Sequence, residues 1–353
     1  MSNSRRTRAL AASLVAALAF AAGVSASAQA PSRAPASLVF VENTNGGDVS
    51  VIDATTLKVL GTIPVGLSPD DIVTAPAGDV LYLSRIVHRA DGRPTGTGEL
   101  VTIDVATRKV LWRVPFRGVP NHLAVAPDGR RVYVTIVSGN YVDVFDPARR
   151  ALIDSVDVGT GPHDIEVSRD GKTVYVGLIR GTDVTAFDAA TNRVVRKIPF
   201  GANVRPIALS HDERRLYVQL SQYYGFVVAD PHLGKILRRV DMPLPSGGKM
   251  PDTLPVTTNH GMRITADGRY LIANGSMTDL VGIYSLPDLR LIATVPVGRD
   301  PNWVTLTPDG RRAFISNRGS DDVSVIDLAS HKEVGRIKVG RYPQRMTSVA
   351  VSR

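Results

Sequence analysis

The chain has 353 residues, a formal net charge of +9 and no cysteine. The lack of cysteine excludes disulfides, lipid-anchored cysteines and Cys-x-x-Cys-His haem attachment, so the fold must be stabilised by burial. Basic residues are scattered among acids rather than grouped, which is typical of a solvated surface and does not favour nucleic-acid binding.

The N-terminus is predicted to be a secretory signal peptide. Arg5, Arg6 and Arg8 precede an apolar, Ala-rich run over residues 9–22 that is too short to span a bilayer. The Ala26-Ser27-Ala28 triplet fits the small-residue cleavage rule, so we expect residues 1–28 to be removed, which lowers the formal charge to +6. No later segment is predicted to cross a membrane, and the mature protein is expected to be periplasmic or secreted.

After a short linker, residues 29–37, one unit recurs with a period of roughly 40 to 50 residues. The cleanest copy begins at Pro120-Asn121-His122, turns at Pro127-Asp128-Gly129, continues through Val132-Tyr133-Val134 and Val144-Phe145-Asp146, and closes at Val158-Gly159. The closing glycines are Gly66, Gly118, Gly159, Gly201, Gly298 and Gly340, and a degenerate copy ends near Gly247. The chain therefore contains seven copies.

Each copy contains four short β-branched runs bounded by Gly, Pro or Asp, and helical periodicity is absent. Residues 38–353 are therefore predicted to form one all-β domain, a seven-bladed β-propeller of four-stranded antiparallel blades. Asp-Gly pairs are expected to form tight hairpins, at 128/129, 170/171, 267/268 and 309/310. Acids that end the third strands are expected to cap the next turn, namely Asp53, Asp104, Asp146, Asp188, Asp230 and Asp327.

The two ends of the domain predict how the ring closes. The mature chain begins in the second strand of a unit, Leu38 to Glu42, and ends with an unpaired first strand, Met346 to Val351. We expect the C-terminal strand to complete the first blade, because that pairing removes the edges of an open sheet.

The pattern resembles the YVTN-repeat β-propellers of bacterial envelopes and archaeal surface layers. Phe40-Val41-Glu42-Asn43 and Phe314-Ile315-Ser316-Asn317 keep the aromatic residue and the Asn of the family tetrapeptide, whereas Tyr133-Val134-Thr135-Ile136 loses the Asn. The resemblance implies the fold over residues 38–353. It does not imply one activity, because similar propellers include lactonases, lyases, haem-binding domains and proteins with no known reaction.

The repeat also predicts a polar rim at one mouth of the central channel, where each first strand begins. The residue after the Pro position is polar in every copy: Asp70, Asn121, His163, Arg205, His260, Asn302 and Gln344. The next position holds Asp71, His122, Asp164, Pro206, Gly261, Trp303 and Arg345. These side chains could bind a ligand, or they could simply hydrate a water-filled channel.

Two insertions are expected at the same mouth, at about Ile86 to Gly98 and Leu244 to Thr257. Long loops on a rigid scaffold often carry recognition, although they are also tolerated as surface extensions. On the opposite face, His211 replaces the Pro that precedes an Asp hairpin.

The sequence leaves open whether the protein is an enzyme. The first hypothesis is a monomeric binding protein that engages a small molecule or an envelope protein at the channel mouth, because no self-sufficient catalytic motif is present. The alternative is a lactonase or lyase acting on a small anionic or cyclic ester substrate. In it, His163 or His260 is the general base, Arg205 holds a carboxylate, and Asn121 or Asn302 polarises a carbonyl.

The cofactor also stays open. A metal could be held by His122, His163, His260 and Asp164, and a histidine at the mouth could ligate haem iron. Tyr223, Tyr224 and Trp303 beside Arg205 could stack nucleic-acid bases, but ordinary packing explains these aromatic side chains better.

Overall fold

The computed structural model describes residues 36–351, which belong to one compact unit. The predicted signal peptide, residues 1–28, and residues 29–35 of the predicted linker lie outside the described residues. Within the described part of the chain every element is a β-strand, and no helix has the length and apolarity needed to cross a membrane.

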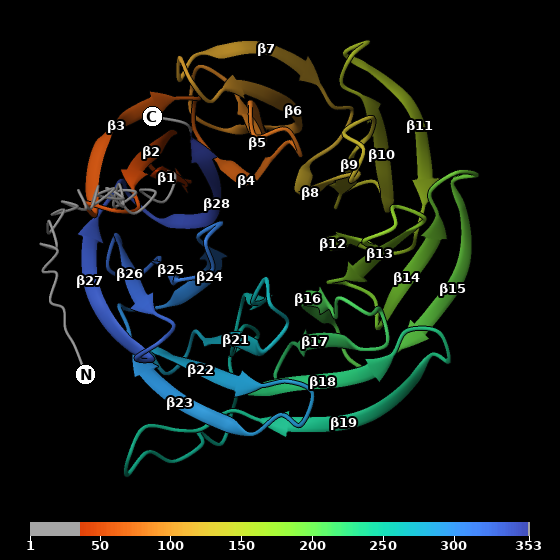
Figure 1. The fold of residues 1–353 in the computed structure, drawn as a ribbon. Coiled ribbons are helices and arrows are strands. Elements are labelled where there is room, and N and C mark those ends of the chain that lie inside the picture. The colour runs from red at the N-terminus through yellow and green to blue at the C-terminus, as the bar shows by residue number, and fades with distance from the viewer. Residues whose placement is uncertain (1–35, 352–353) are drawn as a thin grey trace, which may run out of the picture. The chain divides into compact units, whose positions relative to one another are not determined.

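The strands form seven four-stranded antiparallel sheets, which confirms the predicted seven-bladed β-propeller. Figure 1 shows the sheets arranged around a central axis, with β4, β8, β12, β16, β24 and β28 on the inner side. We number the blades in chain order: blade 1 is β28-β1-β2-β3, blade 2 is β4 to β7, blade 3 is β8 to β11, blade 4 is β12 to β15, blade 5 is β16 to β19, blade 6 is β20 to β23 and blade 7 is β24 to β27.

The innermost strands are β28 (Pro343–Val351), β4 (Pro69–Thr74), β8 (Pro120–Val125), β12 (Pro162–Val167), β16 (Val204–Leu209), β20 (Met262–Ile264) and β24 (Pro301–Leu306). The second strands are β1 (Ala36–Asn43), β5 (Val80–His88), β9 (Val132–Ile136), β13 (Thr173–Leu178), β17 (Leu216–Leu220), β21 (Tyr270–Gly275) and β25 (Arg312–Asn317).

The third strands are β2 (Asp48–Asp53), β6 (Pro94–Asp104), β10 (Tyr141–Asp146), β14 (Asp183–Asp188), β18 (Gly225–Asp230), β22 (Leu280–Ser285) and β26 (Asp322–Asp327). The outer strands are β3 (Lys58–Pro64), β7 (Val110–Pro115), β11 (Ala151–Asp157), β15 (Arg193–Pro199), β19 (Lys235–Asp241), β23 (Leu291–Pro296) and β27 (Lys332–Lys338). In blade 5 the outer strand ends at Asp241, so Gly247, the expected end of the degenerate copy, lies beyond it in the long link to blade 6.

The C-terminal strand closes the ring as predicted. β28 pairs antiparallel with β1 from Ala36 opposite Val351 to Val41 opposite Met346. Blade 1 is therefore built from both ends of the domain, and β28 covers the inner edge of β1.

The predicted turn chemistry is also confirmed. The hairpin glycines have positive φ, at 72° for Gly129 and 68° for Gly310, a conformation that glycine adopts without strain. The acids at the ends of the third strands accept backbone N–H bonds from the next turn. For example, Asp188 Oδ1 accepts from Thr191 and Asp327 Oδ1 accepts from Ser330.

The apolar core consists of seven layers, each between two neighbouring blades. One layer combines Tyr133, Val142 and Val144 of blade 3 with Val174 and Phe187 of blade 4, all almost fully buried. Every outer strand carries a β-bulge where it pairs with the third strand. Bulges at exposed edges disfavour pairing with another chain, so the outer edge of each blade is protected.

Candidate functional site

The structure gathers the predicted rim residues at one mouth of the channel, at or just before the start of the innermost strands. The rings of His122 and His163 lie 4.2 Å apart between centroids, and those of His163 and His260 lie 5.5 Å apart. All three histidines are at most 7% exposed. The imidazoles therefore form a compact buried cluster rather than standing around a wide, water-filled hole.

Two rim carboxylates join neighbouring blades. Asp71 Oδ2 accepts the backbone N–H of Leu123 in blade 3, and Asp164 Oδ2 accepts that of Ile207 in blade 5. The other oxygen of Asp71 accepts the backbone N–H of Ile72. Both carboxylate oxygens of Asp71 thus bind backbone, whereas Asp164 Oδ1 is left to bind side chains of the histidine cluster.

Hydroxyl groups on the second strands make a parallel set of connections. Ser84, Thr135 and Ser316 each donate to the backbone carbonyl of a rim residue in the next blade. Thr135 and Ser316 also accept the N–H of the second rim residue in their own blade. This repeated clamp fixes the backbone of the rim.

Glu42 takes the place of the hydroxyl in blade 1. Its Oε1 accepts the backbone N–H of Arg345 at 3.0 Å, while Oε2 is buried without a hydrogen-bond partner among the described residues. Burial, with the nearby Asp70 carboxylate, raises the pKa of Glu42 well above its ordinary value. A protonated Glu42 would carry the O–H that Ser or Thr supplies in other blades.

At the centre of the mouth, Arg345 and His122 share the free oxygen of Asp164. His122 Nδ1 lies 2.9 Å from Asp164 Oδ1, and Arg345 Nη2 lies 3.3 Å from the same oxygen and 2.6 Å from His122 Nε2. Arg345 Nη2 also lies against His122 Nδ1, so the guanidinium contacts both nitrogens of the imidazole ring. Burial by itself would raise the pKa of Asp164, but Arg345 and the His122 hydrogen bond outweigh it and hold that pKa well below its ordinary value.

Trp303 forms the floor of this cluster. Arg345 stacks on the indole with its guanidinium carbon 3.2 Å from the ring centroid, and Arg263 lies 5.0 Å from that centroid. Arg263 is held by Glu166 at 2.6 Å. A desolvated cation–π contact such as that of Arg345 contributes about 2 kcal/mol, whereas Arg263 is partly exposed and contributes less.

The remaining histidines are neutral bases with few partners. Burial, followed by the influence of His122, lowers the pKa of His163 well below its ordinary value, and its Nδ1 is buried without a partner among residues 36–351. Burial, followed by the influence of His163, lowers the pKa of His260 in the same direction. His260 Nδ1 lies 3.1 Å from Asn302 Nδ2, so the amide orients that ring.

Arg205 lies at the rim position between His163 and His260. Its side chain is buried, and its Nε donates to Ser221 Oγ at 2.9 Å. Neither Nη atom has a hydrogen bond or ion pair with any described residue. Burial, followed by the nearby positive charge of Arg318, lowers the pKa of this guanidinium. Arg205 is therefore a buried cation whose donor pair is free.

The opposite side of the mouth is acidic. Asp70 is half-buried, and burial raises its pKa, although Asn121 Nδ2 donates to its Oδ2 at 2.6 Å. Gln344 completes the ring and is half-buried. Below the rim the channel holds a cavity of about 230 Å³ lined by Asp71, Asp164, Trp303 and Arg345 among others.

Both insertions contact links at this mouth, as predicted. In the first, His88 Nε2 lies 3.4 Å from Ser68 Oγ, just before β4. In the second, the carbonyl of Val256 accepts from Gln222 N in the β17–β18 loop. The two segments therefore lie on the face where a ligand would enter.

The geometry does not assemble the suggested metal site. Among the described residues, no group of three or more His, Asp or Glu is arranged to hold a metal ion. The guanidinium of Arg345 stands against His122 and Asp164, and its charge opposes a cation at that place.

Sequence analysis missed Glu42, Arg263 and Ser221 as members of the site. Glu42 had a usable signal, since alignment of the repeat places it with the hydroxyls of Ser84, Thr135 and Ser316. Arg263 lies three residues after the rim histidine, and nothing in the sequence indicates that it reaches the face of Trp303. Whether the rim residues bind or catalyse stays a prediction.

No family model and no curated protein matches the sequence. Solved structures match it in fold. The periplasmic gluconolactonase of Pseudomonas aeruginosa has a TM-score of 0.73 and 21% identity over 90% of this chain and 99% of its own. Hydrazine synthase of Kuenenia stuttgartiensis has a TM-score of 0.70 and 23% identity over 82% and 92%.

A putative 6-phosphogluconolactonase of Bacteroides fragilis has a TM-score of 0.70 and 16% identity over 91% of this chain and 99% of its own. Structural similarity at these identities establishes a fold and not an activity. The comparisons therefore show that the chain is a seven-bladed β-propeller whose structural neighbours include lactonases.

Proposed function

We propose that this protein is an exported β-propeller of the YVTN-repeat type that binds a small carboxylate-bearing ligand at the channel mouth. The observation that carries the proposal is Arg205, a buried guanidinium whose two Nη groups have no partner among the described residues. The two Nη atoms are not among the buried unpartnered atoms of the described residues, so they are open to the mouth, and a carboxylate is the group that a guanidinium fork binds best.

The surroundings of Arg205 suit such a ligand. His163 and His260 flank it as neutral imidazoles, so they offer hydrogen bonds without adding a carboxylate that would compete for the guanidinium. The acidic groups Glu42 and Asp70 lie on other blades. A ligand with hydroxyls beyond its carboxylate could use both sides of the mouth.

Export is supported by the predicted signal peptide, and a structural neighbour described as periplasmic is consistent with it. The two long segments beside the mouth are suited to cover a bound ligand. They could also contact an envelope protein.

Titration calorimetry with gluconate, a small polyhydroxy carboxylate, tests the proposal on the mature protein. Arg205→Gln should weaken binding about tenfold or more, because a charged bidentate contact is lost. The matched control is Arg299→Gln, an exposed arginine in the β23–β24 link at the same mouth, which should leave binding unchanged. Equal loss in both variants would contradict a specific role for Arg205.

A second candidate is lactone hydrolysis at the same place, favoured by the unpartnered Nδ1 of His163 beside Arg205. His163 would take a proton from water while the water oxygen bonds to the lactone carbonyl carbon, and Arg205 would stabilise the resulting oxyanion. The ring C–O bond would then break, and the leaving oxygen would receive the proton from the imidazolium.

A pH-stat assay with glucono-δ-lactone tests this candidate. Turnover above the uncatalysed rate that is lost in His163→Ala would support it, and His260→Ala tests the other predicted base. If neither substitution changes the rate, neither histidine is the base. If gluconate binds and no turnover occurs, the protein is a binding protein.

A further inference from the structure

The end of the channel opposite the rim contains a second cavity, of about 400 Å³. It lies where the innermost strands of blades 4, 5 and 6 end, and its polar lining comes from Glu166, Arg169, Ser210, His211 and Arg263. Small-molecule sites typically have volumes of about 300–1,000 Å³, so the cavity is large enough for a small ligand.

The lining departs from the repeat at one position. In blades 2, 3 and 7 a Pro opens the turn between the first and second strands. In blades 4, 5 and 6, which form the cavity, another residue takes that position. The Pro residues are Pro76, Pro127 and Pro308, and the replacements are Arg169, His211 and Ala266. The replacements remove three rings and bring a guanidinium and an imidazole to one place.

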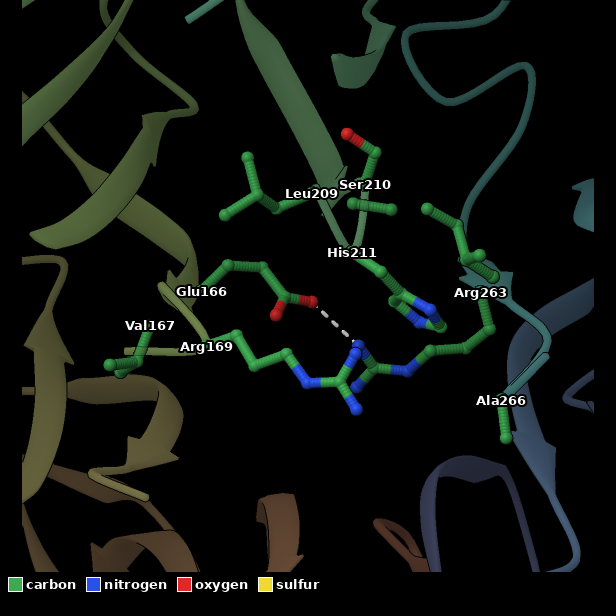
Figure 2. A pocket seen from close by; sticks show the side chains of 10 residues that line it. Glu166, Val167, Arg169, Leu209, Ser210, His211, Arg263 and Ala266 are labelled. Carbon is green, nitrogen blue, oxygen red and sulfur yellow. Dashed lines mark hydrogen bonds and ion pairs between the residues drawn. The ribbon is translucent and has the colours of Figure 1, made fainter. Parts of the chain in front are cut away.

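Figure 2 shows the guanidinium groups of Arg169 and Arg263 extending toward one another below the Glu166 carboxylate, with the His211 imidazole beside them. Arg263 Nη1 is bound to Glu166 Oε1 at 2.6 Å. The Arg169 side chain has no hydrogen bond or ion pair with a described residue; only its backbone N–H bonds, to Glu213. Two guanidiniums thus face one carboxylate, which leaves an excess of positive charge in the cavity.

We propose that this cavity is a second ligand site, which takes a small dianion such as phosphate, a phosphate monoester or a dicarboxylate. Arg169 supplies a free donor fork, and Arg263 supplies the donors that Glu166 does not use. His211 adds an imidazole on the third side. The Ser210 hydroxyl takes no part, because it already donates to Asp212 in the hairpin.

This site is distinct from the rim site. Arg205 lies at the start of β16 and His211 lies just after its end, so the length of an innermost strand separates the two sites. A ligand at Arg169 is therefore out of reach of Arg205, and either site can be removed without touching the other.

The test uses the mature protein carrying Arg205→Gln, so that the rim site cannot contribute. Binding of inorganic phosphate is followed by calorimetry and by the width of its ³¹P signal, in a buffer without other multivalent anions. We expect saturable binding at one site, and Arg169→Gln in the same background should weaken it about tenfold. The control is Arg311→Gln, an exposed arginine of the blade 7 hairpin outside the cavity, which should leave binding unchanged.

Malonate should compete with phosphate for the site. The site would be ruled out if the Arg205→Gln protein gives no saturable binding of either anion, or if Arg169→Gln binds as its parent does. Arg169 is exposed, so its variant should keep the parent melting temperature. If the protein with Arg205 intact binds no gluconate while phosphate binding is retained, the proposed function is removed and this inference stands.

Discussion

The two sides of the channel mouth use burial in opposite ways. On one side Glu42 and Asp70 are carboxyl groups whose pKa is raised, so burial favours their protonated forms. On the other side His163 and His260 are imidazoles whose pKa is lowered, so burial favours their deprotonated forms. Both sides therefore approach neutrality, and Arg205 remains as a charge without a protein counter-ion.

The difference shows on which side the polar side chains are used by hydrogen bonds within the protein and on which side they keep polar atoms for a ligand. On the acidic side, Asp71 of blade 2 uses both carboxylate oxygens to accept backbone N–H groups. On the side of blades 4 to 6, His163 Nδ1 has no partner among the described residues, and Arg205 donates only through its Nε. We therefore assign the ligand to the side of blades 4 to 6.

Removing β28 should have the largest effect on this comparison, because that strand carries Arg345 between the two sides. A chain ending at Gly340 loses the innermost strand of blade 1 and exposes the edge of β1. We expect it to aggregate or to melt at a much lower temperature, measured by circular dichroism. An unchanged melting temperature would contradict the role of β28 in closing the ring.

Arg345→Met should have the next largest effect. The substitution leaves Asp164 buried without its cation, and breaking a buried ion pair in this way costs about 3–5 kcal/mol. Urea denaturation measures the change in the free energy of unfolding. Arg341→Gln, in the exposed link before β28, is the control and should change it by less than about 0.5 kcal/mol.

The smallest effects should appear in the pH dependence of stability, and they should have opposite signs on the two sides. A raised carboxyl pKa means that the folded state holds more protons than the unfolded state. Glu42 therefore lowers stability as the pH rises above 4.5, the ordinary pKa of this carboxyl group. A lowered imidazole pKa means that the unfolded state holds more protons than the folded state. His163 therefore lowers stability as the pH falls below 6.5, the ordinary pKa of this imidazole.

Substitutions should separate these two slopes between pH 4.5 and 6.5. Glu42→Gln imitates the protonated acid and should make stability rise more steeply with pH, with a net gain at neutral pH. His163→Gln should make the rise shallower. Urea denaturation at several pH values measures both, and equal slopes in the wild type and the two variants would show that neither group is linked to folding.

The periodic features of the fold could be predicted from the sequence. The seven copies, the closure by the C-terminal strand and the position of both insertions follow from the spacing of Pro, Gly and Asp, because these residues set local turns that recur once per blade. The degenerate fifth copy was placed less well. β19 ends at Asp241, and Met242 is buried where other copies have a residue before a closing glycine.

The rim residues could be predicted as a set, because each follows the same Pro position. Their individual partners could not. Asn43 and Asn317 show what local sequence can indicate, since each binds an Asp and a Ser a few residues ahead. His122 and Arg345 are 223 positions apart and meet only because the ring brings blades 1 and 3 to one channel.

The sequence by itself determined the number of blades, their turns and the ring of polar residues at the mouth, because these depend on contacts that repeat locally along the chain. Only the tertiary structure decided that the mouth is a packed cluster rather than a water-filled entrance. That outcome depends on side chains that converge from different blades. Asp164 forms an ion pair with Arg345, Trp303 stacks on the Arg345 guanidinium, and the Nη atoms of Arg205 have no partner among the described residues.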